Sequence, residues 1–221
     1  MQPYTLLITS CRRHGLLSET LDSFEAQVDI EPQATVIVED GVDSPRPGWL
    51  NRYKRLGEIT WLENGARKGQ LYSADRLWKA CQTQYAFWSE DDWRYTDTGF
   101  IQKSYDILKD YPEVLTVSLR GWFLTNWHPL VADARFPFTV LSRDFGGGWG
   151  AFSFNCGLRR KSDWQRAGES YAALVEQTHN PIFERELSKI HIDLGYVIPD
   201  IGKYIEHTGG DRSCYREDEW K

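Results

Sequence analysis

The sequence predicts an α/β protein built on a mainly parallel sheet, and two observations carry this prediction. Within residues 4–93, runs rich in strand-forming residues alternate with amphipathic helical patterns. Each of the strand-like runs ends in polar residues, as expected where the carboxyl ends of parallel strands meet at one edge of a sheet.

Four strands and two helices are expected in this first part of the chain. Strands are predicted over residues 4–9, 34–38 and 59–62, with a fourth in the apolar run that begins at Tyr85. A helix over about residues 16–26 follows from Leu17, Leu21 and Phe24, which recur at helical spacing. A second helix is expected over about residues 70–82, so that helical crossovers join parallel strands.

The second half of the chain has a less regular pattern. A helix is predicted over about residues 98–110, and strands over 114–119, 152–158 and 196–199. A last helix carries Phe183 and Leu187 and ends before Gly195. The glycines at 146–148 allow either a close approach of the backbone to a ligand or a flexible loop.

Composition limits the classes of function. The chain has 221 residues, 41% of them hydrophobic, and a formal net charge of −6, which argues against a general nucleic-acid binder. We expect no membrane-spanning segment and no signal peptide. The four cysteines are scattered and form no C-x-x-C pair, which fits a reducing compartment and predicts a cytoplasmic protein. Contact with a membrane surface stays open.

Three carboxylates stand together where the fourth predicted strand ends: Glu90, Asp91 and Asp92. Ionising all three together requires solvent or a cation nearby, and Mg²⁺ and Mn²⁺ prefer such oxygen ligands. In an extended chain Glu90 and Asp92 would point to one side and Asp91 to the other. Taken alone, the triplet fits a helix start capped by Ser89, or a solvated turn, better than a metal site. Residues 93–99 continue a helix poorly, which favours the site.

Polar residues also follow the other three predicted strands. Residues 10–13 follow the first strand, Asp40 the second and Asn64 the third. Ligands of parallel sheets bind outside the carboxyl ends of the strands. This convergence therefore favours a nucleotide and metal site over a helix cap.

The order of these motifs resembles that of the GT-A-fold glycosyltransferases, most of all the family-2 type, over nearly the whole chain. Residues 7–13 resemble the family's opening strand and T-x-N-R-like turn, and residues 36–41 its V-V-D-D-G segment. Residues 64–65 resemble its N-x-G, and residues 90–92 stand at its D-x-D. Residues 183–195 are similar to its E-D-x-x-L…G-Y, and residues 205–210 to its closing H-x-G. The E-D-D spelling with a later Gly-Gly-Gly-Trp also resembles the N-acetylglucosaminyltransferase I type.

The resemblance implies a GT-A fold, a Rossmann-like sheet flanked by helices with a smaller acceptor-side β region, in a single domain. Residues 1–93 would form the nucleotide-binding half, 94–210 the acceptor-binding half and 211–221 a tail. The implied reaction moves a sugar from a nucleotide-sugar donor, a UDP-sugar in first place, to a hydroxyl of a glycan or another acceptor. A general base on the acceptor side gives in-line displacement with inversion.

Metal ligands and the catalytic base are implied at particular positions. Asp92 is the leading metal ligand and His207 the second, and neutral imidazole favours Mn²⁺ over Mg²⁺. An ordinary, partly buried histidine is the alternative for His207. Glu184 stands at the position of the family's base, with Glu186 as the second choice.

The donor site has a larger set of candidates. Asp40 would accept a hydrogen bond from the base, or cap the turn at Gly41. Arg12, Arg13, Arg67 and Lys68 could pair the diphosphate, although a solvated surface charge is favoured for Arg13 and Lys68. Trp122, Trp127 and Trp149 could stack on a sugar or pack in the core. The expected nucleotide-sugar residues are Thr9, Ser10, Arg12, Asp40, Asn64, Arg67, Glu90, Asp91 and Trp149.

Two departures from the family pattern keep an alternative open. Cys11 replaces a usual Asn, and Glu184 replaces the usual catalytic Asp. A catalytically silent module that binds a nucleotide sugar or a glycan is therefore the second prediction. A nucleotidyltransferase is disfavoured, since residues 10–15 lack the Gly-rich phosphate loop that it needs.

Overall fold

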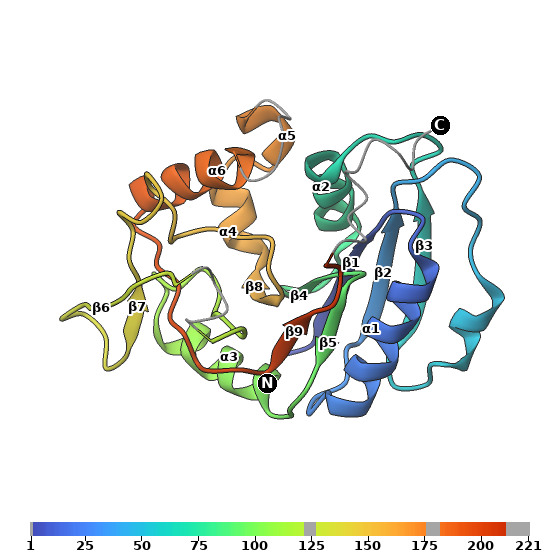
Figure 1. Ribbon diagram of the computed structural model, residues 1–221, viewed down its shortest axis with the longest axis horizontal. Helices are drawn as coiled ribbons and strands as arrows, with labels where there is room; N and C mark the ends of the chain where they lie inside the picture. Colours follow the sequence, from blue (N-terminus) through green and yellow to red (C-terminus); the bar gives the residue numbers. More distant parts are fainter. Residues whose placement is uncertain (1, 122–126, 176–181, 211–221) are drawn as a thin grey trace.

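A five-stranded sheet in the order β3-β2-β1-β4-β8 forms the centre of the molecule (Figure 1). The computed structural model describes residues 2–121, 127–175 and 182–210. Strands β1 (Tyr4–Ser10), β2 (Ala34–Glu39), β3 (Glu58–Glu63) and β4 (Tyr85–Glu90) run parallel, and β8 (Gly157–Arg160) pairs antiparallel with β4. The predicted α/β class with a mainly parallel sheet is confirmed.

The helical patterns of the first half also form as predicted. Helix α1 (His14–Gln27) joins β1 to β2, and α2 (Gln70–Ala80) joins β3 to β4, each within two residues of the predicted ends. The loop between β2 and β3 contains one short 3₁₀ turn, η1 (Gly48–Arg52). Both helices end in extended residues, Val28 and Cys81, which start the return to the sheet.

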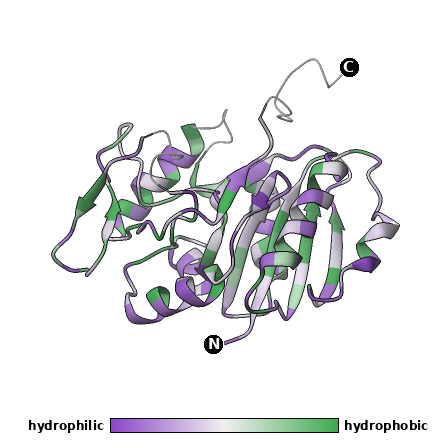
Figure 2. Cartoon of the chain, turned by 60° about the horizontal axis from the view of Figure 1, so that its bottom comes forward, coloured by the Kyte–Doolittle hydropathy of each residue, from purple (hydrophilic) through white to green (hydrophobic). Residues whose placement is uncertain are grey.

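Strand alternation divides the core between the two faces of the sheet. Leu6 and Ile8 of β1 pack in a cluster with Leu21 and Phe24 of α1. Leu7, between them, packs on the other face in a cluster with α2 and α6 (Ile182–Asp193). Figure 2 shows hydrophobic residues concentrated in the strands and hydrophilic ones on the outer sides of the helices. Burial on both faces explains why β1 reads as a continuous apolar run.

The second half differs from the prediction in several places. Residues 114–119 and 196–199 form no regular strand, only isolated bridges such as Val114 with Val197 and Ser118 with Asp200. The strand predicted at 152–158 starts only at Gly157. Alternation and β-branched residues predict burial here, but the partner segments meet over one or two residues at a time.

Short elements complete this half. Strand β5 (Trp93–Tyr95) pairs with β9 (Ile205–His207), and β6 (Leu130–Ala132) with β7 (Thr139–Leu141). Helix α3 (Phe100–Asp110) packs in the cluster that contains α1, whereas α4 (Lys161–Arg166) and α5 (Tyr171–Leu174) pack in the cluster that contains α2 and α6 (Figure 1). The β5–β9 pair brings residues 205–207 beside the acidic turn after β4.

The strand order creates one crevice at the sheet's carboxyl edge. From β1 the chain proceeds to β2 on one side and later to β4 on the other, so the order reverses at β1. Ligands of open α/β sheets bind at such a switch point. Here the neighbours are Ser10 of β1 and Glu90 of β4, since Thr9 is in register with Glu90.

Candidate active site

The acidic triplet forms the turn between β4 and β5. Strand β4 ends at Glu90, Asp91 and Asp92 form the turn, and β5 begins at Trp93. The Trp93 N–H donates to Thr20 Oγ1 over 3.0 Å, which fixes the exit of the turn. The turn replaces the fully extended arrangement, and the strand that follows excludes the helix start that was the alternative.

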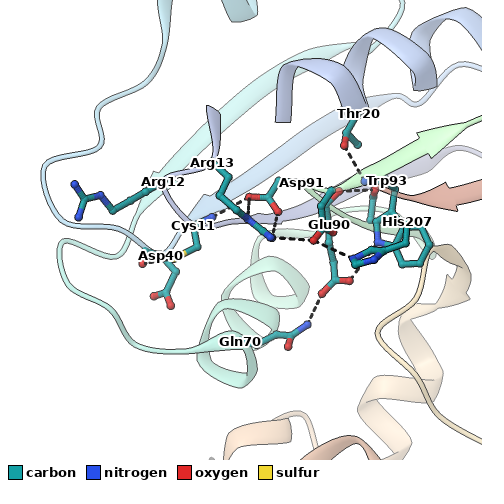
Figure 3. A network of polar contacts seen from close by, with 12 residues as sticks. Cys11, Arg12, Arg13, Thr20, Asp40, Gln70, Glu90, Asp91, Trp93 and His207 are labelled. Carbon is teal, nitrogen blue, oxygen red and sulfur yellow. Dashed lines mark hydrogen bonds and ion pairs between the residues drawn. The ribbon is translucent and has the colours of Figure 1, made fainter. Parts of the chain in front are cut away.

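Asp91 and Asp92 share one guanidinium, that of Arg13. Arg13 Nε donates to Asp91 Oδ2 over 3.2 Å, and Nη2 pairs with Asp91 Oδ1 (Figure 3). Nη1 of the same guanidinium lies 2.9 Å from Asp92 Oδ2. The Cys11 N–H also donates to Asp91 Oδ2, over 3.1 Å. The prediction that Arg13 is a solvated surface charge is wrong, because its side chain is only 18% exposed.

Asp92 also contacts the histidine at the end of the described chain. Asp92 Oδ2 lies 3.2 Å from His207 Nε2, and the Thr208 N–H donates to the Asp92 carbonyl oxygen over 2.8 Å. His207 packs against the Trp93 ring, with centroids 5.0 Å apart. Burial raises the pKa of Asp92, but the hydrogen bonds and charges of His207 and Arg13 together outweigh it, so the net pKa is lowered. Asp92 is therefore held as a carboxylate.

Gly209 leaves the space that this pair occupies. A Cβ on Gly209 would lie 2.4 Å from Asp92 Oδ2 and 2.9 Å from His207 Nε2. Since real Cβ atoms do not approach other atoms this closely, any other residue at 209 would push the Asp92 or His207 side chain aside. The H-x-G pattern thus has a local steric reason in this chain.

The Asp92–His207 pair fits a divalent cation. Two ligand atoms bound at about 2.1 Å and at right angles lie about 3 Å apart, close to the 3.2 Å between Oδ2 and Nε2. Mixed oxygen and nitrogen ligands suit Mn²⁺. Among the described residues no group of three or more His, Cys, Asp or Glu side chains could hold a metal. Further ligands for a cation at this pair would have to come from a bound substrate or from water.

Glu90 lies beside the pair and is partly buried. One of its oxygens accepts a hydrogen bond from Gln70 Nε2, and the other lies 3.3 Å from Trp93 Nε1. Burial raises its pKa well above the usual value, and the charges of Asp92 and Glu184 raise it further. Glu90 therefore interacts electrostatically both with Asp92 in the acidic turn and with Glu184 on α6.

Most predicted nucleotide-sugar residues line one small cavity at the switch point. It measures about 60 Å³ and includes Arg13, Gln70 and Ser73, together with six of the predicted residues: Thr9, Ser10, Asp40, Arg67, Glu90 and Asp91. A pocket for a whole small ligand measures about 300–1,000 Å³. A nucleotide would therefore need side chains in this crevice to move.

Asp40 organises the wall of the crevice. Its Oδ1 accepts hydrogen bonds from Asn64 Nδ2 and the Lys68 N–H, both over 2.7 Å, and its Oδ2 accepts from the Gly69 N–H over 2.8 Å. The carboxylate thus caps the turn before α2. The hydrogen bonds of the Asp40 side chain thus go to residues 64–69 and not to the predicted turn at Gly41. The Asn64 side chain supports the same wall of the crevice.

Arg12 adopts a left-handed backbone conformation at the turn after β1, with φ of 56°. Its N–H donates to Glu39 Oε1 over 2.6 Å, so the buried Glu39 holds this turn in place. The Arg12 side chain is exposed and points away from the acidic turn in Figure 3. The arginine that meets the acids is therefore the next one, Arg13.

Glu184 lines a second, larger cavity on the side of α6. The cavity measures about 510 Å³ and also includes Arg120, His128, Trp149, Ser153 and Asn155. Glu184 Oε1 accepts the Phe154 N–H over 2.8 Å, while its Oε2 makes no hydrogen bond among residues 2–121, 127–175 and 182–210. Burial raises the pKa of Glu184 above the usual value. A carboxylate of raised pKa in a cavity is suited to accept a proton.

Two arginines, Arg120 and Arg159, interact electrostatically with this carboxylate. The Arg120 guanidinium stacks on the Trp93 ring at 5.2 Å and connects the cavity to the acidic turn. Arg159 is buried, and its Nη2 donates to the carbonyl oxygens of Ser153 and Asn155. Burial lowers the pKa of both guanidinium groups, whereas the charge of Glu184 acts in the opposite direction. Arg159 thereby fixes the loop whose N–H binds Glu184.

Other predicted residues lie outside these two cavities. Glu186 is exposed and pairs with Lys189 over 3.0 Å. It follows Glu184 by two residues in α6, so the two side chains leave the helix on different sides. Lys68 is exposed as predicted, and Trp127 is 69% exposed. Trp122 lies outside the described residues. Only Trp149 of the three tryptophans lines the larger cavity.

Several site residues were not predicted. Arg13 was expected at the surface, while Gln70, Arg120 and Arg159 were not singled out at all. Position could have indicated Arg13, since it follows the first strand within the same polar turn. No local pattern identifies Arg120 or Arg159, because their roles depend on segments that come together only in the fold.

Comparison with known proteins gives a match at the level of fold. No protein family and no curated protein matches the sequence. Residues 1–349 of S. aureus TarS match with a TM-score of 0.65 and 13% identity, over 95% of this chain and 61% of that one. The same fragment in complex with UDP matches with a TM-score of 0.60 and 13% identity, over 92% and 59%.

A third solved structure contains both a donor and a metal. The mannosyltransferase PcManGT from Pyrobaculum calidifontis, in complex with GDP-Man and Mn²⁺, matches with a TM-score of 0.60 and 17% identity, over 91% of this chain and 56% of that one. Together with the sheet order, these matches establish a GT-A-type glycosyltransferase fold. The chain spans between 36% and 61% of the length of the matched proteins. No helix in the described part of the chain is long and apolar enough to cross a membrane.

Proposed function

We propose that this protein is a metal-dependent glycosyltransferase that moves a sugar from a nucleotide-sugar donor to a hydroxyl acceptor. The observation that carries the proposal is the Asp92–His207 pair, 3.2 Å apart, beside a crevice at the sheet's switch point. A buried carboxylate, Glu184, lines the neighbouring cavity. The matched proteins with bound UDP or with GDP-Man and Mn²⁺ support the same assignment.

Asp92 and His207 would hold Mn²⁺, or Mg²⁺ with lower preference. A cation there supplies positive charge for the diphosphate leaving group. Thr9, Ser10 and Arg67 would line the donor's path along the crevice. Asp40 keeps the crevice wall in shape, and Glu90 would meet the donor's ribose or a metal-bound water. A UDP-sugar is the first choice of donor.

Glu184 would act as the general base on the acceptor. The acceptor's O–H proton moves to Glu184, the oxygen bonds to the anomeric carbon, and the bond from that carbon to the diphosphate oxygen breaks. Attack from the side opposite the leaving group inverts the anomeric centre. Trp149 in the same cavity offers a stacking surface for a sugar ring.

A donor screen tests this proposal. Purified protein with Mn²⁺ is incubated with UDP- and GDP-sugars, and released nucleoside diphosphate is measured. We expect release with at least one donor, lost in Asp92→Ala and in Glu184→Gln. Asp92→Ala should also lose metal-dependent binding of the donor, whereas Glu184→Gln should keep it.

The alternative is a module that binds a nucleotide sugar or a glycan without turnover. Cys11 and Glu184, which replace the usual Asn and the usual catalytic Asp of the resembled family, are the features that favour it. Tight donor binding across the screen with no released diphosphate would establish the module and exclude the enzyme.

A further inference from the structure

The acidic turn already contains a cation of its own, the guanidinium of Arg13. It binds Asp91 through two N–H groups and Asp92 through one, Nη1 at 2.9 Å. The oxygen that Nη1 contacts, Asp92 Oδ2, is the same one that faces His207 Nε2. A divalent metal at this pair would thus compete with Arg13 for one carboxylate oxygen.

The two halves of this contact differ in strength. Asp91 is 1% exposed, binds Arg13 in the bidentate manner and also accepts the Cys11 N–H. Asp92 contributes a single hydrogen bond to Arg13. Asp91 is therefore the anchor of the guanidinium, and the contact with Asp92 is the one that can exchange.

We propose that Arg13 is a built-in counter-cation that competes with the divalent metal for Asp92, and that the donor's diphosphate relieves the competition by accepting the released Nη1–H. This inference rests on the proposed function. It makes Arg13 a positioning residue that couples metal binding to nucleotide binding. Metal alone binds weakly, and metal with a nucleoside diphosphate binds well.

The geometry of the crevice supports the diphosphate as the new partner. Arg13 and Asp91 line the same cavity as Arg67 and Gly69. A phosphate group that enters this cavity therefore meets the Arg13 guanidinium, which suits phosphate oxygens. The cavity measures only about 60 Å³ while Arg13 holds both acids, so entry of a diphosphate and movement of Arg13 belong together.

Binding of Mn²⁺ tests the coupling without any turnover. Free Mn²⁺ is followed by electron paramagnetic resonance for wild type, Arg13→Gln, Arg13→Lys and Arg94→Gln, each with and without UDP or GDP. Titrations of nucleotide without protein correct for Mn²⁺ that the nucleotide binds by itself. Arg94 is the matched control, since it carries the same charge and is the exposed residue of β5, one residue after Trp93.

We expect nucleotide to tighten Mn²⁺ binding to wild type by about tenfold or more. Repulsion between a guanidinium and a divalent cation about 5 Å apart, even in a water-like dielectric, changes affinity by about tenfold. Arg13→Gln should therefore bind Mn²⁺ alone about tenfold more tightly than wild type and show a smaller tightening by nucleotide, because only the direct ligation of Mn²⁺ by the diphosphate remains. Arg13→Lys keeps the charge and should stay within about threefold of wild type, and Arg94→Gln should match wild type.

Other outcomes would overturn the proposal in distinguishable ways. If Arg13→Gln binds Mn²⁺ alone no more tightly than wild type, Arg13 does not compete, although the proposed function stands. If Arg13→Gln fails to fold, as judged by its melting curve, the titrations of wild type alone still test the coupling. Equal Mn²⁺ affinity of wild type with and without nucleotide would refute it. If no protein binds Mn²⁺ under any condition, the metal-dependent function fails together with this inference.

Discussion

Adding one methyl group at Gly209 should disable the metal pair while leaving the fold intact. In Gly209→Ala the new Cβ would lie 2.4 Å from Asp92 Oδ2 and 2.9 Å from His207 Nε2. Contacts between carbon and oxygen normally lie at about 3.3 Å or more. The Asp92 carboxylate must therefore move by about 1 Å, away from the position where it faces His207.

The size of the effect follows from this displacement. Misplacing a functional group by about 1 Å costs about 100-fold in affinity or rate, or about 2.7 kcal/mol. The fold should lose much less, because the atom that must move is the end of a side chain. We expect Mn²⁺ affinity in the presence of UDP, measured by electron paramagnetic resonance, to fall about 100-fold, with a similar loss of diphosphate release.

Gly210→Ala is the matched control. Its Cβ would meet nothing within 4 Å, but its φ of 49° is unfavourable for alanine. The control should therefore lose about 1 kcal/mol of stability and keep the Mn²⁺ affinity of wild type. Wild-type Mn²⁺ affinity in Gly209→Ala would refute the assignment of Asp92 and His207 as the metal pair.

Three further predictions concern pH and stability. The pKa of Glu184 is raised in the folded state, so the stability that this group contributes is lost as pH rises through that pKa. Glu184→Gln should therefore have a higher melting temperature than wild type at pH 8 and the same melting temperature at pH 4. Equal melting temperatures at both pH values would contradict the buried carboxylate. For the same reason, the acid limb of the wild-type pH–rate profile should lie above the ordinary Glu value of about 4.3, and a limb at or below that value would exclude Glu184 as the base. Asp75 is buried and accepts hydrogen bonds from Ser170 Oγ and the N–H groups of Tyr171 and Ala172. Asp75→Ala should therefore lower the free energy of unfolding, measured in urea, by about 3 kcal/mol, and Asp75→Asn by less. A loss below about 1 kcal/mol in Asp75→Ala would show that these hydrogen bonds contribute little.

Local pattern was sufficient for the first half of the fold. The alternating runs of β1 to β4 and the helical spacing of α1 and α2 predicted every element within two residues, because each pattern is set by the faces that a strand or helix buries. The same reasoning failed at residues 114–119, where apolar alternation reports burial but not a hydrogen-bonded partner.

The candidate site, too, was predicted from local pattern only in part. Thr9, Ser10, Asp40, Arg67, Glu90 and Asp91 were predicted from strand ends and resemblance, and they line one cavity. Whether they bind a nucleotide sugar stays a prediction, as do the inverting mechanism, the likeness to the N-acetylglucosaminyltransferase I type and a cytoplasmic location. Glu184 and Glu186 could not be separated from the sequence, because both are acids of one helical segment. In the structure, Glu184 is buried beside the Phe154 N–H and Glu186 pairs with Lys189 at the surface.

Local patterns in the amino acids were enough to predict the class of the fold and the edge of the sheet at which chemistry is expected. Both follow from local periodicity and from the rule that parallel strands present their carboxyl ends together. Two contacts became visible only in the folded chain: Arg13 binds both Asp91 and Asp92, and His207 meets Asp92 from 115 positions away in the sequence. Those contacts depend on the pairing of β5 with β9 and on the turn before α1, and such long-range packing leaves no periodic signal in the amino acids.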